Sequence, residues 1–188
     1  MKTFATMGGG VKYLTFTLAS ETYGVEIRHV KEIAGLAPFT LVPNAPKFLR
    51  GVVNLRGKII PVIDLCVKFG MSSRPDSRDT CIIVMNLRLN QTQVLTGILV
   101  DSVREVLDVL PSRIEPLPAF GLQVDTSFLL GVLRVEERMT LLLDIEKALS
   151  HEEQSSLEMA SSEGLELEPA LVAADISAYA EKNLVAAE

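Results

Sequence analysis

The stretch that decides the fold is 48–65, FLRGVVNLRGKIIPVIDL, because a diverged copy of it lies eighty residues downstream. Residues 128–145 read FLLGVLRVEERMTLLLDI, and five residue types recur in register. The polar middle differs, with NLRGK in the first copy and RVEER in the second. A shared framework with different turns predicts a duplicated fold in which one copy has been specialised. The matched pairs are Phe48 with Phe128, Leu49 with Leu129, Gly51 with Gly131, Val52 with Val132, and Asp64 with Asp144.

The repeat extends upstream of this stretch. Residues 24–33 read GVEIRHVKEI and residues 97–106 read GILVDSVREV, and in both a Val follows the Gly by six positions and a Glu by eight. A period near eighty residues is too long for a solenoid and implies a paired-domain architecture. We therefore expect two units, at 11–70 and 79–149, followed by an acidic tail at 150–188.

Charge is distributed unevenly along the 188 residues, which suffice for one ordinary domain or two small ones. Residues 151–188 hold nine acidic residues and one lysine, a balance of −8, whereas residues 1–150 hold fifteen acidic and seventeen basic residues, a balance of +2. The acidity therefore belongs to the tail. No clustered basic face of the kind that binds nucleic acid stands out, so we expect no nucleic-acid partner.

Cysteine use and the termini indicate the compartment. Cys66 and Cys81 are the two cysteines, without a Cys-x-x-Cys spacing. One disulfide is open to them in an oxidising compartment, but two reduced, buried thiols fit better. The N-terminal residues lack the apolar stretch of a signal peptide, and no apolar run approaches the ~18 residues that span a bilayer. We expect a cytoplasmic protein without direct membrane insertion.

Period-two alternation and β-branched residues predict mostly strands. Gly57 suits the positive φ of a hairpin turn after Arg56. Pro61 removes a ladder donor, so one side of its strand must lie at an edge or a barrel corner. Short strands broken by turns at this frequency favour small barrels over a parallel sheet. The expected strands are 13–18, 25–27 after a turn at 21–24, 52–55, 59–65, 81–86, 94–100, 105–109 and 139–143.

Helical signals are few. Short helices are expected at 46–49 and at 145–149, the second after an N-cap at Asp144. Residues 71–79, MSSRPDSRD, are typical of a loop between the units. Ser150 and Glu153 form a capping-box pattern, so a helix can start there. For the rest of the tail, helix and a solvated, disordered segment both stay open, and the composition favours the second.

The residue set for catalysis is missing from the sequence. His29 and His151 have no metal-ligand spacing, so no metal or cofactor is expected. No phosphate loop or nucleophile elbow occurs. Asp64, Asp101 and Asp144 each follow an apolar strand, where a carboxylate more often caps a turn than acts in catalysis. We expect a non-enzymatic protein with no catalytic residue.

Glu32 and Arg56 stand out when the two units are compared. The second unit keeps an acid at the first position, Glu105, and has the opposite charge at the second, Glu136. If the units share a fold, the first brings Glu32 and Arg56 together, whereas the second places two acids there. Two interpretations stay open: an ordinary exposed pair worth about 0–1 kcal/mol, or the organiser of a partner-binding edge that only the first unit has.

The same residues resemble a known family. YLTFTLASETYGVEI, VKEI and PNAPKFLRGVVNLRGKIIPVIDL resemble the CheW family of chemotaxis coupling proteins, and the similarity runs to about Leu149. The signature N-L-R-G-x-x-x-P-x-x-D-L is complete from Asn54 to Leu65. The resemblance implies two intertwined, five-stranded SH3-like β-barrels, in agreement with the duplication. The acidic tail and the glycines at 8–10 depart from the compact family pattern.

The resemblance also implies partners and sites. It implies an adaptor that links the cytoplasmic tips of methyl-accepting chemoreceptors to the regulatory domain of the histidine kinase CheA, in arrays at the membrane. Positions matching the receptor-binding groove of the family are Val103 and Val106. Alternatives are an adaptor for a chemosensory-like pathway with another output, or a small-ligand-binding barrel. Positions matching the kinase-binding surface are Val30, Glu32, Gly51 and Arg56.

Overall fold

The computed structural model describes residues 10–72, 75–117, 126–135, 137–149 and 153. Within them the chain forms strands, the four-residue helix α1 (Leu65–Lys68) and two 3-10 turns, η1 (Ile27–His29) and η2 (Pro111–Arg113), and Glu153 is also helical. The predicted mostly-β class is therefore confirmed. The strands are β1 (Val11–Leu18), β2 (Glu21–Glu26), β3 (Val30–Gly35), β4 (Leu49–Leu55), β5 (Lys58–Asp64), β6 (Cys81–Leu89), β7 (Thr92–Val100), β8 (Ser102–Val109), β9 (Ile114–Glu115), β10 (Leu129–Val135) and β11 (Arg138–Leu143).

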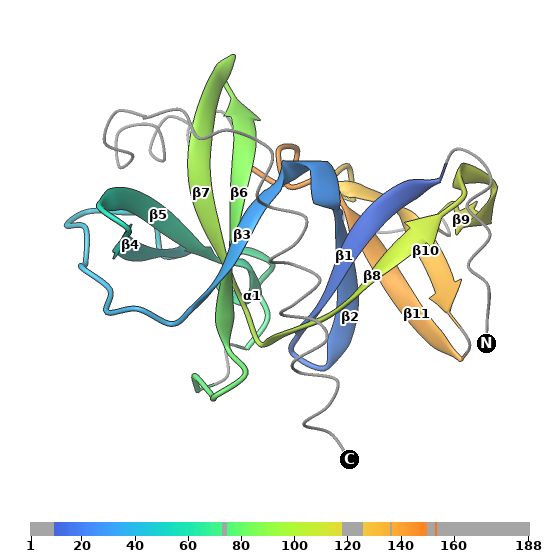
Figure 1. Ribbon diagram of the computed structural model, residues 1–188, viewed down its shortest axis with the longest axis horizontal. Helices are drawn as coiled ribbons and strands as arrows, with labels where there is room; N and C mark the ends of the chain where they lie inside the picture. The colour runs from blue at the N-terminus through green and yellow to red at the C-terminus, as the bar shows by residue number, and fades with distance from the viewer. Residues whose placement is uncertain (1–9, 73–74, 118–125, 136, 150–152, 154–188) are drawn as a thin grey trace.

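Two curled sheets lie side by side, and each takes strands from both halves of the sequence (Figure 1). Sheet A has the order β8-β1-β2-β11-β10-β9, and sheet B has the order β3-β6-β7-β5-β4. Strands β3 and β8 occupy equivalent positions in the repeat, and each pairs with the hairpin of the other half. Sheet A thus combines the hairpin β1–β2 with later strands, and sheet B combines the hairpin β6–β7 with earlier ones. This exchange accounts for the intertwined barrels.

The duplicated framework is visible in individual hydrogen bonds. The Asp64 N–H donates to the Phe48 carbonyl at 2.8 Å, and the Asp144 N–H donates to the Phe128 carbonyl, also at 2.8 Å. Both bonds close the hairpin that carries the repeated stretch. The repeated Phe and Asp therefore hold the same positions in both hairpins.

The repeated glycines Gly51 and Gly131 share one backbone conformation. Their φ values are +143° and +152°, which favour glycine. A Cβ at Gly51 would lie 2.6 Å from the Thr40 carbonyl oxygen, and one at Gly131 would lie 2.7 Å from the Glu115 carbonyl oxygen. Both glycines also sit at register shifts in their hairpins. The glycine is thus required by a bulge against a neighbouring backbone.

Gly24 and Gly97 mark the places where the two halves join. Gly24 pairs in parallel with Leu142, and Gly97 pairs in parallel with Val62. A Cβ on either glycine would lie 3.0 Å from the side chain of its partner. Small residues at these two positions let the parallel strands approach.

Three apolar clusters stabilise this arrangement. Val53, Ile60 and their neighbours form a cluster from sheet B strands alone. Tyr13 and Leu133 belong to a cluster from sheet A strands alone. The largest cluster takes residues from both sheets and includes Phe16. Burial of apolar surface therefore holds the two sheets together as well as filling each of them.

The β1–β2 turn differs from the prediction. The structure places the turn at Ala19 and Ser20, both with positive φ, and residues 21–24 belong to strand β2. The Asp101 carboxylate accepts a hydrogen bond from the Ala19 N–H at 2.8 Å. This cap comes from a distant part of the chain, so the local sequence gave no sign of it. Asp101 does cap a turn, as expected for a carboxylate after an apolar strand.

Neither predicted short helix forms. Residues 46–49 make a turn in which the Leu49 N–H donates to the Pro46 carbonyl at 2.9 Å, because β4 begins at once and draws the chain into the sheet. Residues 145–149 make a turn rather than a helix, since Ile145 and Leu149 are drawn into the shared core.

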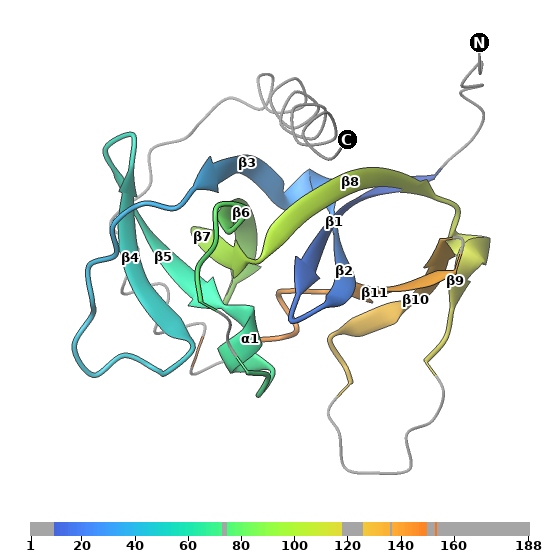
Figure 2. The ribbon, with the colours of Figure 1, turned by 90° about the horizontal axis from the view of Figure 1, so that it is seen from below.

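The helix that does form is α1, at the boundary between the two sheets (Figure 2). Its N-cap is Asp64, whose Oδ1 accepts from the Val67 N–H at 3.1 Å. In the second copy Asp144 Oδ1 accepts from the Lys147 N–H at 3.2 Å, which confirms the capping role predicted there. The repeated aspartate therefore starts a turn in both copies.

The remaining strand predictions hold with shifted ends, and β3, β9 and β10 were not predicted as strands. The ladder between β5 and β7 begins at Val62, directly after Pro61, so Pro61 lies where one side of β5 is not yet paired.

The described parts of 71–79 form no strand or helix, as expected. Cys66 and Cys81 are buried and form no disulfide, as predicted. Within the described ranges no helix has the length and apolarity needed to cross a bilayer.

Candidate functional site

The site begins with a bulge in strand β3. Val30 pairs with Met85 and Glu32 pairs with Val84, so Lys31 is an extra residue on β3. A bulge of this kind re-aims the side chains beside it. Val30 is buried in the shared core, whereas the Glu32 carboxylate is only partly covered.

The hairpin turn between β4 and β5 supplies the second group. Arg56 and Gly57 have φ of +52° and +83°, the pattern of a type I′ turn. The Asn54 side-chain oxygen accepts from the Gly57 N–H at 2.9 Å and fixes the turn. Asn54 and Gly57 thus hold the Arg56 side chain at the tip of the hairpin.

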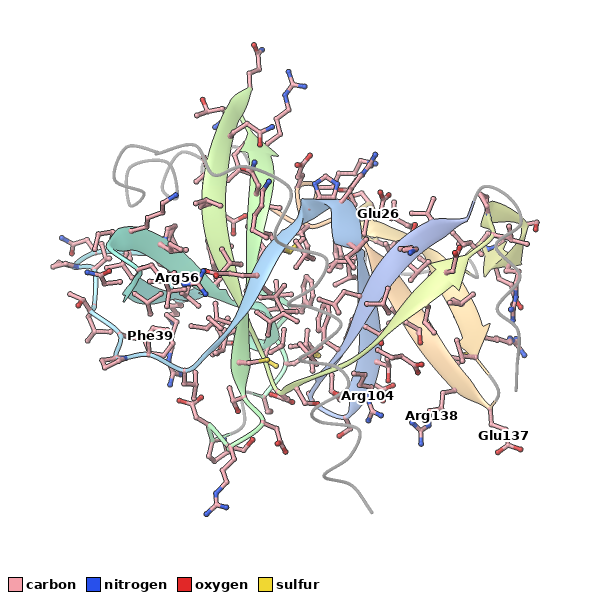
Figure 3. All side chains as sticks on the ribbon, in the orientation of Figure 1. Glu26, Phe39, Arg56, Arg104, Glu137 and Arg138 are labelled. Atoms are coloured by element: carbon pink, nitrogen blue, oxygen red, sulfur yellow. The ribbon has the colours of Figure 1, made fainter. Side chains whose placement is uncertain are left out.

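Glu32 and Arg56 meet as the repeat predicted. Arg56 Nη1 lies 3.1 Å from Glu32 Oε2. The Arg56 side chain is 83% exposed and the Glu32 side chain 26% exposed. Figure 3 shows Arg56 on the sheet B side of the molecule. The pair therefore bridges strand β3 and the β4–β5 hairpin, which lie at opposite edges of sheet B. Most of the guanidinium group still faces solvent.

The equivalent place in sheet A is different. The Glu105 backbone lies in the matching bulge of β8, where the Thr15 hydroxyl donates to its carbonyl at 2.7 Å and accepts from its N–H at 3.1 Å. The Glu105 side chain is exposed, and among the described residues it has no ion-pair partner. Glu136 lies outside the described residues. Glu137 and Arg138 stand at the far end of the molecule from Arg56 (Figure 3).

The other two residues predicted for the kinase-binding surface are buried. Val30 belongs to the shared core, and Gly51 is buried at its bulge against Thr40. Val30 lies at the β3 bulge that carries Glu32, and Gly51 lies in β4, which leads into the Arg56 turn. Among the four predicted residues, the structure brings Glu32 and Arg56 into direct contact.

Val103 and Val106 lie on β8 beside the shared core. Val103 is buried in the core, and Val106 is half-buried and packs against it. They do not line the pocket described next. Their predicted role in binding a receptor stays a prediction.

A pocket of about 100 Å³ lies elsewhere, where η1 and β6 meet the turn after β11. Its rim carries an ion pair between Arg28 Nε and Glu26 Oε2 at 2.5 Å. Arg28 Nε also donates to His29 Nε2 at 3.1 Å, and His29 Nδ1 lies 3.9 Å from Glu146 Oε1. Pockets for small molecules are usually about 300–1,000 Å³. This pocket is too small for such a ligand, and no metal-ligand cluster occurs in the described part of the chain.

Two further contacts were not predicted. Arg50 stacks over Phe39, with its guanidinium carbon 5.5 Å from the ring centre, and reaches Asp76 at 3.1 Å. Lys68 Nζ binds Glu153 and lies 5.1 Å from the centre of the Phe48 ring. Both contacts join residues from separate elements, and the repeat has no charged counterpart for either lysine or arginine: Leu130 and Ala148 stand there.

Comparison with known proteins identifies the family of this chain. The CheW-like domain model matches residues 12–153. The chain belongs to the CheW-like family. It is 42% identical over 146 residues to the chemotaxis protein CheW of Klebsiella aerogenes, covering 78% of this chain and 86% of that protein. It is 30% identical over 148 residues to the CheW of Bacillus subtilis, covering 78% of this chain and 92% of that protein.

A solved CheW structure matches the fold. The scaffolding protein TtCheW from Thermoanaerobacter tengcongensis superposes with a TM-score of 0.67 at 33% identity, covering 80% of this chain and 94% of that chain. The CheW-like family consists of chemotaxis scaffold proteins, and this chain is a scaffold of that type. The CheW-like match ends at Glu153, so residues 154–188 lie beyond it.

Proposed function

We propose that the chain is a non-enzymatic adaptor that couples the cytoplasmic tips of chemoreceptors to the histidine kinase CheA in chemotaxis and array assembly. Membership of the CheW-like family supports the scaffold role. The observation that carries the coupling role is the Glu32–Arg56 pair, which joins β3 to the specialised turn. The second copy cannot make it with the residues it has.

The kinase regulatory domain binds the edge formed by Glu32 and Arg56, with Val30 and Gly51 as its support. Arg56 offers several exposed guanidinium donors, and a guanidinium binds a carboxylate in a bidentate manner. Glu32 holds this side chain in one place before the partner arrives. An exposed pair contributes about 0–1 kcal/mol to folding, so its value lies in orienting the donors rather than in stability.

The receptor tip binds beside β8, near Val103 and Val106. An amphipathic helix commonly lays its apolar face into a hydrophobic groove. Val106 is half-buried against the shared core, so an apolar side chain of a receptor helix can extend that core. The chain acts in the cytoplasm, attached to receptor arrays at the membrane.

The test is a pull-down with two baits, the CheA regulatory domain and a receptor cytoplasmic fragment. The chain should be captured by both. Arg56→Glu should lose the kinase bait and keep the receptor bait, whereas Val106→Glu should show the reverse pattern. Capture of the unchanged chain by neither bait would overturn the adaptor proposal. Arg138→Glu, an exposed arginine at the other hairpin turn, is the matched control and should keep both partners.

A further inference from the structure

The pocket where η1 and β6 meet the turn after β11 has an apolar floor and a charged rim. Leu130 stands beside the floor with 38% of its surface exposed. A ligand that covers this side chain would remove apolar surface from water, which favours binding. The floor itself consists of five buried side chains, those of Val25, Met85, Leu87, Leu143 and Ile145.

Two carboxylates of the rim are held in place by neighbouring groups. Glu146 Oε1 accepts a hydrogen bond from the Arg88 N–H of β6 at 2.7 Å, and Glu26 Oε2 lies 2.5 Å from Arg28 Nε. Because Arg28 Nε also donates to His29 Nε2, the imidazole is an acceptor at this atom and carries no charge. A ligand meets both carboxylates already positioned, which lowers the cost of ordering them on binding.

The rim is acidic on balance. Among the described residues that line the pocket, the carboxylates of Glu26, Asp144 and Glu146 face the guanidinium of Arg28, a balance of −2. Lys147 contacts Asp144 at 3.2 Å from outside the lining and brings the balance to −1. The pocket therefore attracts a basic group and repels an acidic one.

The repeat gives this pocket an equivalent place elsewhere in the fold, where the matching residues make internal contacts. Cys66 matches Glu146 and is 4% exposed, whereas the Glu146 side chain is 32% exposed. Asp101 matches Arg28, and its carboxylate caps the β1–β2 turn. The charged, partly exposed rim is thus confined to one of the two equivalent places.

The size of the pocket selects a single side chain. Its volume is about 100 Å³, whereas pockets for small molecules begin at about 300 Å³. An arginine has an apolar stem that lies along apolar surface and a planar guanidinium that binds carboxylates. Arginine is also among the residues that most often anchor a protein interface in a pocket of the partner.

We propose that this pocket binds one arginine side chain of a partner protein, with the stem against Leu130 and the guanidinium at the carboxylates of Glu26 and Glu146. The site is additional to the two surfaces of the proposed function, because its lining takes no residue from the β4–β5 turn or from β8. Figure 3 shows Glu26 near the middle of the molecule, away from Arg56. The scaffold thus has a third point of contact with proteins.

The experiment is an NMR titration of the full chain with N-acetyl-arginine methylamide at about 50 mM salt. The backbone amide resonances of His29, Leu130 and Glu146 should shift and saturate in the millimolar range. N-acetyl-citrulline methylamide has the same shape without the charge and should bind roughly threefold more weakly or worse. Resonances that the arginine probe leaves unshifted would overturn the proposal, and so would equal binding of the citrulline probe.

Three variants test the residues of the pocket. Glu146→Gln keeps the shape of the side chain and should weaken binding of the arginine probe by roughly threefold or more. Leu130→Arg introduces the residue found at the matching position, Arg50, and should prevent saturation because it places a cation at the mouth. Glu137→Gln changes an exposed acid at the far end of the molecule and should bind the probe like the unchanged chain (Figure 3). Unweakened binding to Glu146→Gln or Leu130→Arg would overturn the proposal.

Two further variants separate this inference from the proposed function. Arg56→Glu and Val106→Glu change the proposed kinase and receptor surfaces, and both should bind the arginine probe like the unchanged chain. Loss of the probe in either variant would show that the pocket is not a separate site. If the probe fails while the kinase and receptor baits both capture the chain, the pocket proposal falls and the adaptor proposal stands.

Discussion

The two hairpin turns at 54–58 and 134–138 sit on the same framework and differ in chemistry. Both hairpins are closed by an Asp N–H that donates to a Phe carbonyl at 2.8 Å, and both contain a glycine at a bulge. In the first, Arg56 reaches Glu32 on β3, whereas in the second the matching acid, Glu105, is exposed. Backbone geometry was thus retained in both copies, and the turn residues were left to vary. Partner choice in a duplicated scaffold can change there at little cost to folding.

The largest expected effect comes from breaking the shared framework. Gly51→Ala and Gly131→Ala each force a Cβ to within 3 Å of a neighbouring carbonyl oxygen at a φ that side chains rarely adopt. Each should lower the free energy of unfolding by about 2–4 kcal/mol in urea denaturation. Gly57→Ala is the control, because it has positive φ but open space around it, and should cost about 1 kcal/mol. A neutral Gly131→Ala would show that only the first copy needs its bulge.

The next effect concerns the turn that differs. Arg56→Glu and Glu32→Arg should each weaken binding to the CheA regulatory domain by roughly tenfold or more, while the unfolding free energy changes by less than about 1 kcal/mol. The double swap restores an ion pair and should recover part of the affinity, as measured by isothermal titration. Losses that simply add in the double swap would show that the two residues act independently.

A smaller effect distinguishes two of the buried threonines, Thr15 and Thr96. The Thr15 hydroxyl satisfies the backbone of Glu105 in the β8 bulge, whereas Val84 occupies the equivalent position in sheet B. Thr15→Val should cost about 1–2 kcal/mol, because a backbone N–H and carbonyl lose their partner. The buried Thr96 hydroxyl has no hydrogen-bond partner among the described residues, so Thr96→Val should stabilise by about 0.5–1.5 kcal/mol. Denaturation midpoints that move in the same direction would contradict this contrast.

The smallest expected effect is a pH dependence of the unfolding free energy that involves Tyr23. Thr96, which does not titrate, stands at the matching position of the second unit. Burial raises the pKa of Tyr23, and Glu21 and Cys66 act in the same direction. The unfolded chain loses this proton first, near pH 10, so the stabilisation is present below that pH and is lost as pH rises through the folded pKa. Tyr23→Phe keeps the ring and should lessen the stability loss between about pH 9 and pH 11. An unchanged alkaline slope would assign the titration to other groups.

Sequence comparison predicted the parts of the fold that the repeat encodes. Comparison of the two units singled out Glu32 and Arg56, whose counterparts are Glu105 and Glu136, and the structure brings Glu32 and Arg56 into contact. Asp64 and Asp144 were expected to cap turns because each carboxylate follows an apolar strand, and both do so. Periodicity missed β3, since its bulge breaks the alternation at Lys31.

The contacts that the sequence could not predict join distant elements. The pair Lys68–Glu153 joins α1 to the start of the tail. The cap from Asp101 to Ala19 joins the loop between β7 and β8 to the β1–β2 turn. Ala19 and Glu153 lie outside the repeated stretches, so the repeat gave no register to compare. Which hairpin pairs with β3 or β8 is decided by burial of the shared core, and a tandem repeat alone is equally compatible with two separate barrels.

The exchange of strands has a consequence during protein synthesis. Sheet A is completed by the parallel pairing of β2 with β11, which joins Thr22 to Thr140 across more than a hundred positions. A ribosome must therefore deliver nearly the whole domain before the first hairpin finds its partner. Contacts of such high sequence separation slow folding, and the open strand edges are prone to aggregation meanwhile. The exchange of strands between the repeated halves therefore makes each half depend on the other for its folding during synthesis.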